Sequence, residues 1–206
     1  MTGEPDQTGH SAGISSFAAL GDSFTAGNGC DPRERWPDLI ADGLRASNPG
    51  LRYLNLARDG ATSDEVRGQV EGAIEFGPDL VTIICGANDV ILSPRPDILA
   101  FQVRFSSMLD RLMDARPGAT VLTSTYPEQW QLKGVGPRTR SRMQTGMAGL
   151  NEAIRSVAAS RAVPCLDVVD HPAIQDPSNY QADGLHPSAA GHRQAANELR
   201  KAIESI

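Results

Sequence analysis

Short apolar runs alternate with longer segments of helical periodicity along most of the chain. The apolar runs predict five strands, at residues 14–20, 51–56, 79–85, 119–124 and 163–169. The third run is apolar almost throughout, a pattern typical of strands buried on both faces of a parallel sheet. The alternation therefore predicts a sheet whose strands are connected by helices.

The segments between these runs carry apolar residues at helical spacing. They predict helices over residues 34–46, 97–115 and 138–161, one that follows the capping residues 61–64 and continues to Ile74, and a last helix opened by Pro187. We expect the helix over 138–161 to be weakened around Gly146 and Gly149, because glycine is a poor helix former.

Five strands alternating with helices predict an α/β fold with three layers, in which helices cover both faces of a parallel sheet. We expect the flavodoxin-like strand order 2-1-3-4-5. A chain of 206 residues is long enough for one domain with a substantial core, predicted over residues 14–206. Residues 1–13 are polar and predict a disordered tail.

Composition narrows the function classes. The formal net charge of −6 argues against nucleic acid as a partner, and no apolar run is long enough to span a membrane. The N-terminal residues lack the pattern of a secretory signal, so the sequence predicts a cytoplasmic protein, or a secreted one if a signal has been removed. Three well-separated cysteines, Cys30, Cys85 and Cys165, predict buried free thiols, with a Cys30 disulfide as the less favoured alternative.

In folds of this class, ligands bind beyond the carboxyl ends of the strands. The first strand ends in Gly21-Asp22-Ser23, which places a serine where a nucleophile would be exposed and where its N–H could face an oxyanion. A serine in this position is more often a helix cap. A phosphate-binding turn is a second alternative, although the spacing of its glycines matches no phosphate-loop motif.

A serine hydroxyl needs a general base, and the chain offers four histidines. His186 stands three residues after Asp183, with Gly184 between them to allow a tight turn. Such a turn would bring the carboxylate back to Nδ1 of the imidazole and leave Nε2 for Ser23. The sequence leaves open that both residues only build the turn.

Donors for a developing oxyanion follow the second and third strands. The candidates are the N–H of Gly60 and the side-chain amide of Asn88. Each residue also has an ordinary interpretation, Gly60 as a turn residue and Asn88 as a helix cap.

Together these residues resemble the motifs of the SGNH hydrolase family, also called GDSL esterases and lipases. Gly21-Asp22-Ser23, Gly60, Gly86-Ala87-Asn88-Asp89 and Asp183-Gly184-Leu185-His186-Pro187 are similar to its successive sequence blocks, over nearly the whole domain. The first block departs slightly, with Phe24 where the family often has leucine.

The resemblance implies a flavodoxin-like hydrolase fold and an acyl-enzyme mechanism without metal or cofactor. It also implies a nucleophile at Ser23, a base at His186 oriented by Asp183, and oxyanion donors at Ser23, Gly60 and Asn88. We therefore expect a serine hydrolase that cleaves small-molecule acyl esters.

Two alternatives stay open: an acyltransferase that uses the same acyl-enzyme, and a non-catalytic binding module of flavodoxin-like fold. Loop aromatics that could line a substrate pocket are Tyr126, Trp130 and Tyr180, although such residues are as often packing anchors. The absence of a long apolar lid favours short acyl chains, or a carbohydrate or natural-product ester. The oligomeric state has no signature in this sequence.

Overall fold

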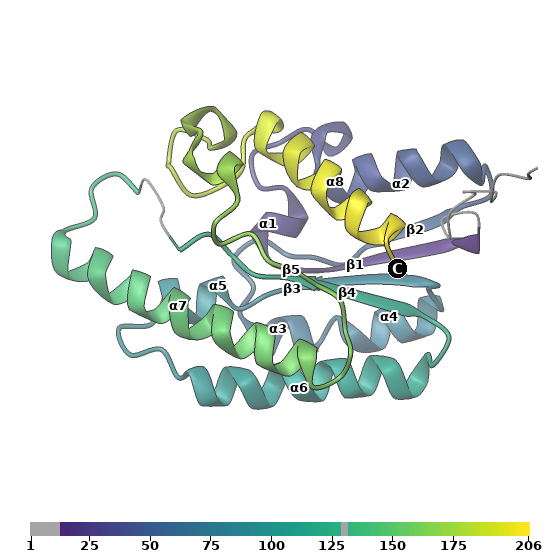
Figure 1. Cartoon of the computed structure of the whole chain (residues 1–206), viewed down its shortest axis with the longest axis horizontal. Coiled ribbons are helices and arrows are strands. Elements are labelled where there is room, and N and C mark those ends of the chain that lie inside the picture. The colour runs from purple at the N-terminus through teal and green to yellow at the C-terminus, as the bar shows by residue number, and fades with distance from the viewer. Residues whose placement is uncertain (1–12, 129–131) are drawn as a thin grey trace, which may run out of the picture.

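A computed structural model describes residues 13–128 and 132–206 of the chain. A five-stranded parallel sheet of order β2-β1-β3-β4-β5 forms the middle layer (Figure 1). Its strands are β1 (Ser16–Gly21), β2 (Arg52–Asn55), β3 (Leu80–Ile84), β4 (Thr120–Ser124) and β5 (Cys165–Leu166). The predicted fold class and strand order are confirmed. Of the tail predicted over residues 1–13, all but Gly13 lies outside the described residues.

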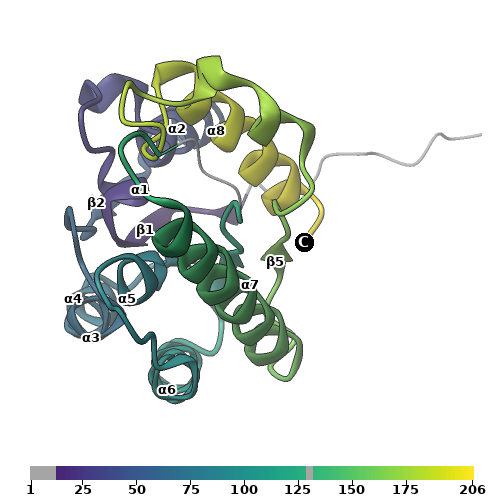
Figure 2. The ribbon, with the colours of Figure 1, turned by 90° about the vertical axis from the view of Figure 1, so that its left-hand side faces the viewer.

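Helices cover both faces of this sheet (Figure 2). On one face lie α2 (Trp36–Ser47) and α8 (Ala189–Glu204), with the short α1 (Ser23–Ala26) at the edge of the sheet. The other face carries α3 (Ser63–Arg67), α4 (Val70–Phe76), α5 (Ala87–Ile91), α6 (Ile98–Ala115) and α7 (Pro137–Ala159). Three 3-10 turns complete the regular structure, at Pro32–Glu34, Pro172–Gln175 and Pro177–Asn179. None of the helices in residues 13–128 and 132–206 has the length and apolar character needed to cross a membrane.

The two central strands, β1 and β3, are buried along their whole length, as their apolar composition predicts. Gly21 at the end of β1 is paired in register with Ile84 at the end of β3. A Cβ on Gly21 would lie 2.3 Å from the carbonyl oxygen of Ile84, so only glycine fits there. The turns that follow these two strands, which hold Ser23 and Asn88, therefore start from adjacent points.

The prediction of a fifth strand over residues 163–169 is too long. Thr125 N–H donates to the carbonyl of Leu166, but the next N–H, that of Val168, donates to the Thr125 hydroxyl instead of a backbone carbonyl. The side chain of Thr125 thus replaces the strand ladder, and β5 keeps two residues. Its edge position also leaves Cys165 half-buried, whereas we expected a buried thiol; Cys85 is buried, Cys30 is half-buried and all three are free.

The single helix predicted from residue 61 to Ile74 is interrupted at Gly68–Gln69 and forms α3 and α4. The Gln69 side chain accepts from the N–H of Gly21 and donates to its carbonyl, both at 2.9 Å. These two bonds hold the break between α3 and α4 against the end of β1. They also satisfy the N–H of Gly21 where β1 ends, and the carbonyl of Gly21 accepts in addition from the N–H of Arg58 at 3.1 Å.

Pro187 does not open the last helix, as predicted, but precedes its cap. Ser188 is the N-cap of α8, and its hydroxyl accepts from the N–H of Gly191. Pro187 is held in an extended conformation by a bridge to Tyr180 and by a hydrogen bond from the Gln181 side chain to its carbonyl. The helix can therefore begin only beyond it.

The predicted weakness at Gly146 and Gly149 is absent, because α7 is continuous through both. Gly146 instead allows α7 to pack closely on α5: an added Cβ would lie 2.6 Å from a methyl group of Val90. The stiff β-branched side chain of Val90 cannot move aside easily. The glycine is thus explained by helix packing.

We expect Gly146→Ala to lower the free energy of unfolding by about 1–2 kcal/mol, because overpacking costs more than the ~1 kcal/mol that alanine contributes to a helix. Gly72 in α4 is the matched control, since its added Cβ would make only ordinary contacts, at 3.6 Å from the Leu56 methyl groups. Gly72→Ala should raise stability by about 0.5–1 kcal/mol. Urea denaturation of both variants measures the two changes in the free energy of unfolding. Stabilisation by both substitutions would contradict the close packing of Gly146 on Val90.

Candidate active site

Ser23 lies at the first position of α1, immediately beyond the end of β1. The carboxylate of Asp22 caps this helix by accepting from the N–H of Phe24 at 3.0 Å. Capping is therefore performed by Asp22, and the Ser23 hydroxyl is available for another role. This resolves the alternative in which Ser23 itself is only a helix cap.

The predicted turn at Asp183 brings three polar side chains into line. Ser23 Oγ lies 3.1 Å from His186 Nε2, and His186 Nδ1 lies 2.6 Å from Asp183 Oδ2. Gly184 adopts the left-handed conformation, with φ of 72°, as the turn requires. The chain of contacts has the connectivity of a nucleophile, a base and the carboxylate that orients it.

Asp183 is fixed by its second oxygen as well. Its Oδ1 accepts from the backbone N–H groups of Leu185 and His186 at 2.9 and 3.1 Å. Partial burial pushes the pKa of Asp183 upward, but the hydrogen bonds from His186 and these N–H groups outweigh it and hold the pKa below its usual value. The carboxylate is therefore kept ionised beside the imidazole.

Gln181, which the sequence analysis did not single out, joins the segment of the base to the segment of the serine. Its side-chain amide donates to the carbonyls of Asn28 and Pro187, at 2.6 and 2.9 Å. Its backbone N–H donates to the carbonyl of His186 at 2.8 Å. No local pattern marks a glutamine for this task, because its partner Asn28 is 153 residues away.

Gly60 and Asn88, the other two predicted donors, lie on neighbouring turns. Gly60 has a φ of 73°, and a Cβ added to it would meet no atom within 4 Å. One N–H of the Asn88 amide donates to the carbonyl of Ala61 at 3.0 Å. An amide carries two such hydrogens, so this bond orients Asn88 and leaves its second N–H for a ligand.

A partly buried ionic network holds the turns of Gly60 and Asn88 together. Asp89 accepts from the N–H and hydroxyl of Ser63, at 2.7 and 2.6 Å. Arg104 from α6 donates to the Ser63 hydroxyl and to Asp89, at 2.8 and 2.9 Å. The network explains the aspartate that follows Asn88. The contribution of Arg104, 15 residues along the chain from Asp89, has no local sequence signal.

Asp22 is fully buried beneath the serine. Its Oδ1 receives the Phe24 N–H, and its Oδ2 receives the hydroxyl of Tyr126 at 2.8 Å. Burial raises the pKa of Asp22 from 3.8 to about 7, although both hydrogen bonds oppose the shift. Tyr126, considered above as a pocket aromatic, thus also supports the helix that carries Ser23.

A cavity of about 150 Å³ lies beside the site, between the sheet and α8. Its wall is mostly apolar and includes Phe24, Leu166, Tyr180 and Leu199. The Phe24 ring is 6.1 Å from the His186 ring and 5.3 Å from the Tyr126 ring, between centroids. Phe24 therefore forms the part of the cavity wall that lies next to His186.

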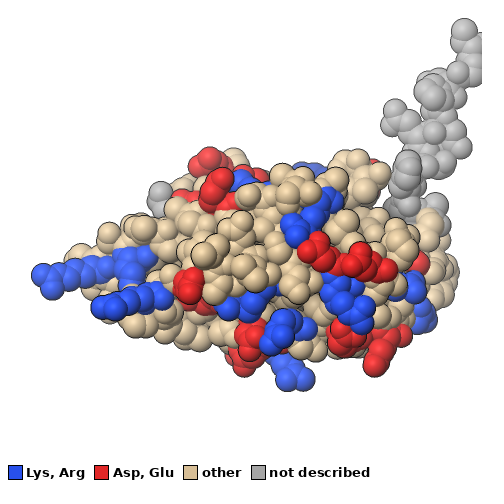
Figure 3. Space-filling view, turned by 90° about the horizontal axis from the view of Figure 1, so that it is seen from below, with Lys and Arg blue, Asp and Glu red and all other residues tan. Residues whose placement is uncertain are grey.

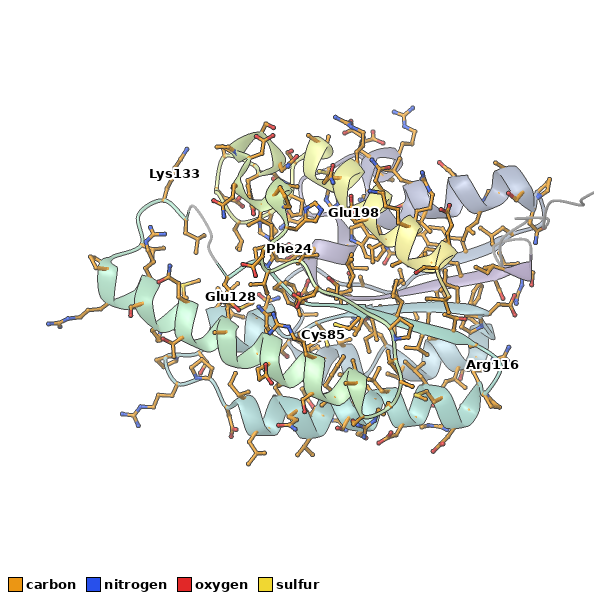
Figure 4. The ribbon with its side chains drawn as sticks, viewed as in Figure 1. Phe24, Cys85, Arg116, Glu128, Lys133 and Glu198 are labelled. Atoms are coloured by element: carbon orange, nitrogen blue, oxygen red, sulfur yellow. The ribbon has the colours of Figure 1, made fainter. Side chains whose placement is uncertain are left out.

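Two of the three aromatic residues predicted to line a pocket do so. Tyr126 and Tyr180 both line the cavity, and Tyr126 is almost completely buried. Trp130 lies outside the described residues. Figure 4 shows Phe24, from α1, and Glu198, from α8, close together above the sheet, and both residues line this cavity.

Comparison with known proteins gives a consistent family. The model of the GDSL-like Lipase/Acylhydrolase family matches residues 19–194. Among curated proteins, the chain is similar to a GDSL lipase of Mycobacterium tuberculosis, with 28% identity over 92% of this chain and 82% of that one.

Solved structures show the same fold. A lipase/acylhydrolase from Enterococcus faecalis superposes with a TM-score of 0.74 at 24% identity, over 92% of this chain and 95% of that one. The esterase EstA from Pseudoalteromonas sp., in a structure inhibited by monoethylphosphonate, gives a TM-score of 0.70 at 19% identity, over 93% and 97%.

The buried carboxyl of Asp22 predicts a pH dependence of stability. With its pKa raised to about 7, the folded protein keeps a proton that the unfolded chain releases near pH 3.8. Its contribution to stability is therefore full below about pH 4 and is lost as pH rises through about 7, with a total of about 4 kcal/mol. Asp22→Asn should remove this pH dependence. The free energy of unfolding of the variant should therefore rise relative to that of the wild type as pH rises.

Urea denaturation at several pH values between 4 and 8 measures this difference. Asp110, whose pKa is lowered by Arg161, serves as the matched control. Asp110→Asn should leave the decline between pH 4 and 7 in place. A constant difference between Asp22→Asn and wild type across the range would contradict the prediction.

Proposed function

This chain belongs to the GDSL-like lipase/acylhydrolase family, whose members are carboxylic ester hydrolases, and we propose that it cleaves esters of short acyl chains through an acyl-enzyme on Ser23. The observation that carries the proposal is the continuous contact from Ser23 through His186 to Asp183. The carboxylate fixes the proton of the neutral imidazole on Nδ1, so that Nε2 is free to accept.

The reaction begins when Ser23 Oγ attacks the ester carbonyl carbon and His186 Nε2 takes the hydroxyl proton. The resulting imidazolium is stabilised by Asp183, which stays ionised. His186 then gives this proton to the leaving alcohol as the carbonyl re-forms, and the acyl group remains on Ser23. Water, activated in the same way, attacks the acyl-enzyme, releases the acid and restores the serine.

The negative charge of each tetrahedral intermediate falls on the former carbonyl oxygen. We assign its three donors to the N–H of Ser23, the N–H of Gly60 and the free N–H of the Asn88 amide. Loss of one such donor typically costs about 2.7–4 kcal/mol of transition-state stabilisation. The network of Ser63, Asp89 and Arg104 holds the turns of Gly60 and Asn88 in place before the reaction, which is the condition under which such donors act most strongly.

The cavity lined by Phe24 supports a preference for short acyl groups. An apolar cavity of about 150 Å³ is large enough for a molecule the size of benzene, so it has room for about six carbon atoms. Longer chains would have to leave it or displace its wall. Packed side chains such as Leu166 and Leu199 make displacement costly.

Ser23→Ala should reduce kcat for p-nitrophenyl butyrate by at least about 10³-fold, because the attacking oxygen is removed while the fold is kept. A fluorophosphonate probe should label the wild type at Ser23, as shown by peptide mass spectrometry, and leave the variant unlabelled. Ser188→Ala, which removes a hydroxyl that caps α8, is the control and should keep the label. Equal activity of Ser23→Ala and wild type would contradict the assignment.

Phe24→Ala should shift the acyl preference toward longer chains, because loss of the ring enlarges the end of the cavity next to His186. We expect kcat/KM for the octanoate relative to the butyrate to rise about tenfold or more. Phe24→Leu, which keeps an apolar side chain, should shift the ratio less. Kinetics with p-nitrophenyl esters of two to twelve acyl carbons give the ratio. An unchanged dependence of kcat/KM on acyl length in Phe24→Ala would mean that the cavity does not bind the acyl group.

A further inference from the structure

Basic side chains gather at the end of the molecule that carries the site. The sequence has no acidic residue between Glu128 and Glu152, although the whole chain has a net charge of −6. This interval contains Lys133, Arg138, Arg140 and Arg142. Long basic side chains project from this end of the molecule, at the left in Figure 3.

Some of the exposed cations at this end have no ion-pair partner among the residues that the structure describes. Several exposed arginines elsewhere pair with carboxylates, namely Arg33, Arg45, Arg67 and Arg111. Among the described residues, Arg52 and Arg58 are also exposed and form no ion pair. Within residues 13–128 and 132–206, Arg95, Lys133 and Arg138 are exposed and form no ion pair. Their charge is therefore not neutralised by the protein.

The position of the charges opposes local helix stability. Arg138, Arg140 and Arg142 lie in the first two turns of α7, whose N-terminus carries the positive end of the helix dipole. That first turn has no acidic residue, and the N-cap, Gly136, provides no side-chain bond. A local rule broken in this way, close to a reactive site, indicates a function outside the fold.

The segment between α5 and α6 lies against this part of α7. The guanidinium of Arg142 donates to the carbonyls of Val90 and Ser93. Gly146 of α7 lies so close that an added Cβ would be 2.6 Å from Val90 and 3.4 Å from Pro96. Residues 90–96, including Arg95, therefore form one surface with the basic start of α7.

Large apolar side chains are exposed beside the same surface. Leu92, Leu99 and Val103 are 65%, 70% and 62% exposed, and Ile206 at the C-terminus is the one other large hydrophobic residue among those described that is exposed in this way. Leu99 and Val103 are four residues apart on α6, so they share one face. Lys133 lies above the sheet, on the opposite side from α6 (Figure 4). We call the set Leu92, Arg95, Leu99, Val103 and Arg138 the basic apolar surface.

We propose that the basic apolar surface binds the protein to a lipid bilayer that contains anionic headgroups. Positive side chains are attracted to such a bilayer, and exposed leucine and valine side chains enter the boundary between headgroups and acyl chains. The combination of positive and exposed apolar side chains favours an anionic bilayer over other partners. A small soluble anion would leave the three apolar side chains exposed to water, and a neutral bilayer would make no use of the charges.

The surface also has a useful position relative to the site. Asn88 and Leu92 are four residues apart, in α5 and at its C-cap, so the proposed oxyanion donor lies one helical turn from a side chain that enters the bilayer. Bound in this way, the enzyme would meet ester substrates where they leave a lipid phase. The binding itself does not depend on the reaction and is tested without it.

Sedimentation with vesicles tests the proposal. The full-length Ser23→Ala protein should bind vesicles of phosphatidylcholine with 30% phosphatidylglycerol, and bind vesicles of phosphatidylcholine alone at least tenfold more weakly. Binding should weaken as salt rises from 50 to 500 mM, because screening shortens the range of the charges. Absence of binding to the anionic vesicles at 50 mM salt would overturn the proposal.

Two variants separate the contributions. Removing both cations in Arg95→Gln/Arg138→Gln should weaken binding about 25-fold, since each cation near an anionic surface contributes about fivefold. Leu99→Ser/Val103→Ser should weaken it without removing the salt dependence. Both variants, made in the otherwise wild-type enzyme, should hydrolyse a water-soluble butyrate ester at the wild-type rate.

The matched control removes the same charge elsewhere, in Arg33→Gln/Arg45→Gln. Equal loss of binding in this control would assign the effect to net charge and overturn the proposed surface. Light scattering distinguishes a second copy of the chain as the occupant. If the protein is a dimer that Leu99→Ser/Val103→Ser dissociates, and it does not bind vesicles, the surface is an interface between two copies of the chain and the bilayer proposal is overturned.

Discussion

The close pairing of β1 with β3 is the constraint on which the rest of the structure depends. The carbonyl of Ile84 approaches Gly21 so closely that no side chain fits between them. The turns that leave these strands therefore start side by side, one with Ser23 and the other with Asn88. Gln69 then bonds to the N–H and the carbonyl of Gly21 and holds the segment after β2 at the same edge. Serine and proposed donors thus converge because of strand pairing, before any specific contact between them.

Much of this arrangement was accessible from the sequence, because strand ends and short motifs are local. The strand order, the turn from Asp183 to His186, and the placement of Ser23, Gly60 and Asn88 at one edge are all found in the structure. What sequence reasoning missed depends on contacts between distant residues. Gln181 reaches Asn28, Arg104 reaches Ser63, and Tyr126 reaches Asp22, and no periodicity relates the members of these pairs.

The incorrect predictions have the same origin. Gly146 indicates weakness when α7 is considered alone, but it is required by the approach of Val90. Pro187 has the composition of a helix start, but Tyr180 and Gln181 hold it in an extended conformation. In β5 the hydroxyl of Thr125 ends a strand that its apolar residues would continue. In each case a tertiary contact overrides a local preference, and such contacts are not encoded in neighbouring residues.

The bond from Gln181 to Asn28 has a consequence for the order in which the enzyme matures. During synthesis the chain emerges from its N-terminus, so Ser23, Gly60 and Asn88 are all present before residue 100 has left the ribosome. Asp183 and His186 are made much later, and Gln181 fixes their segment only once it meets the loop after α1. A chain that ends before residue 183 therefore holds Ser23 without its proposed base. Reactivity toward esters should begin only after residue 186 has emerged, and it reports that the segment of His186 has folded against the segment of Ser23.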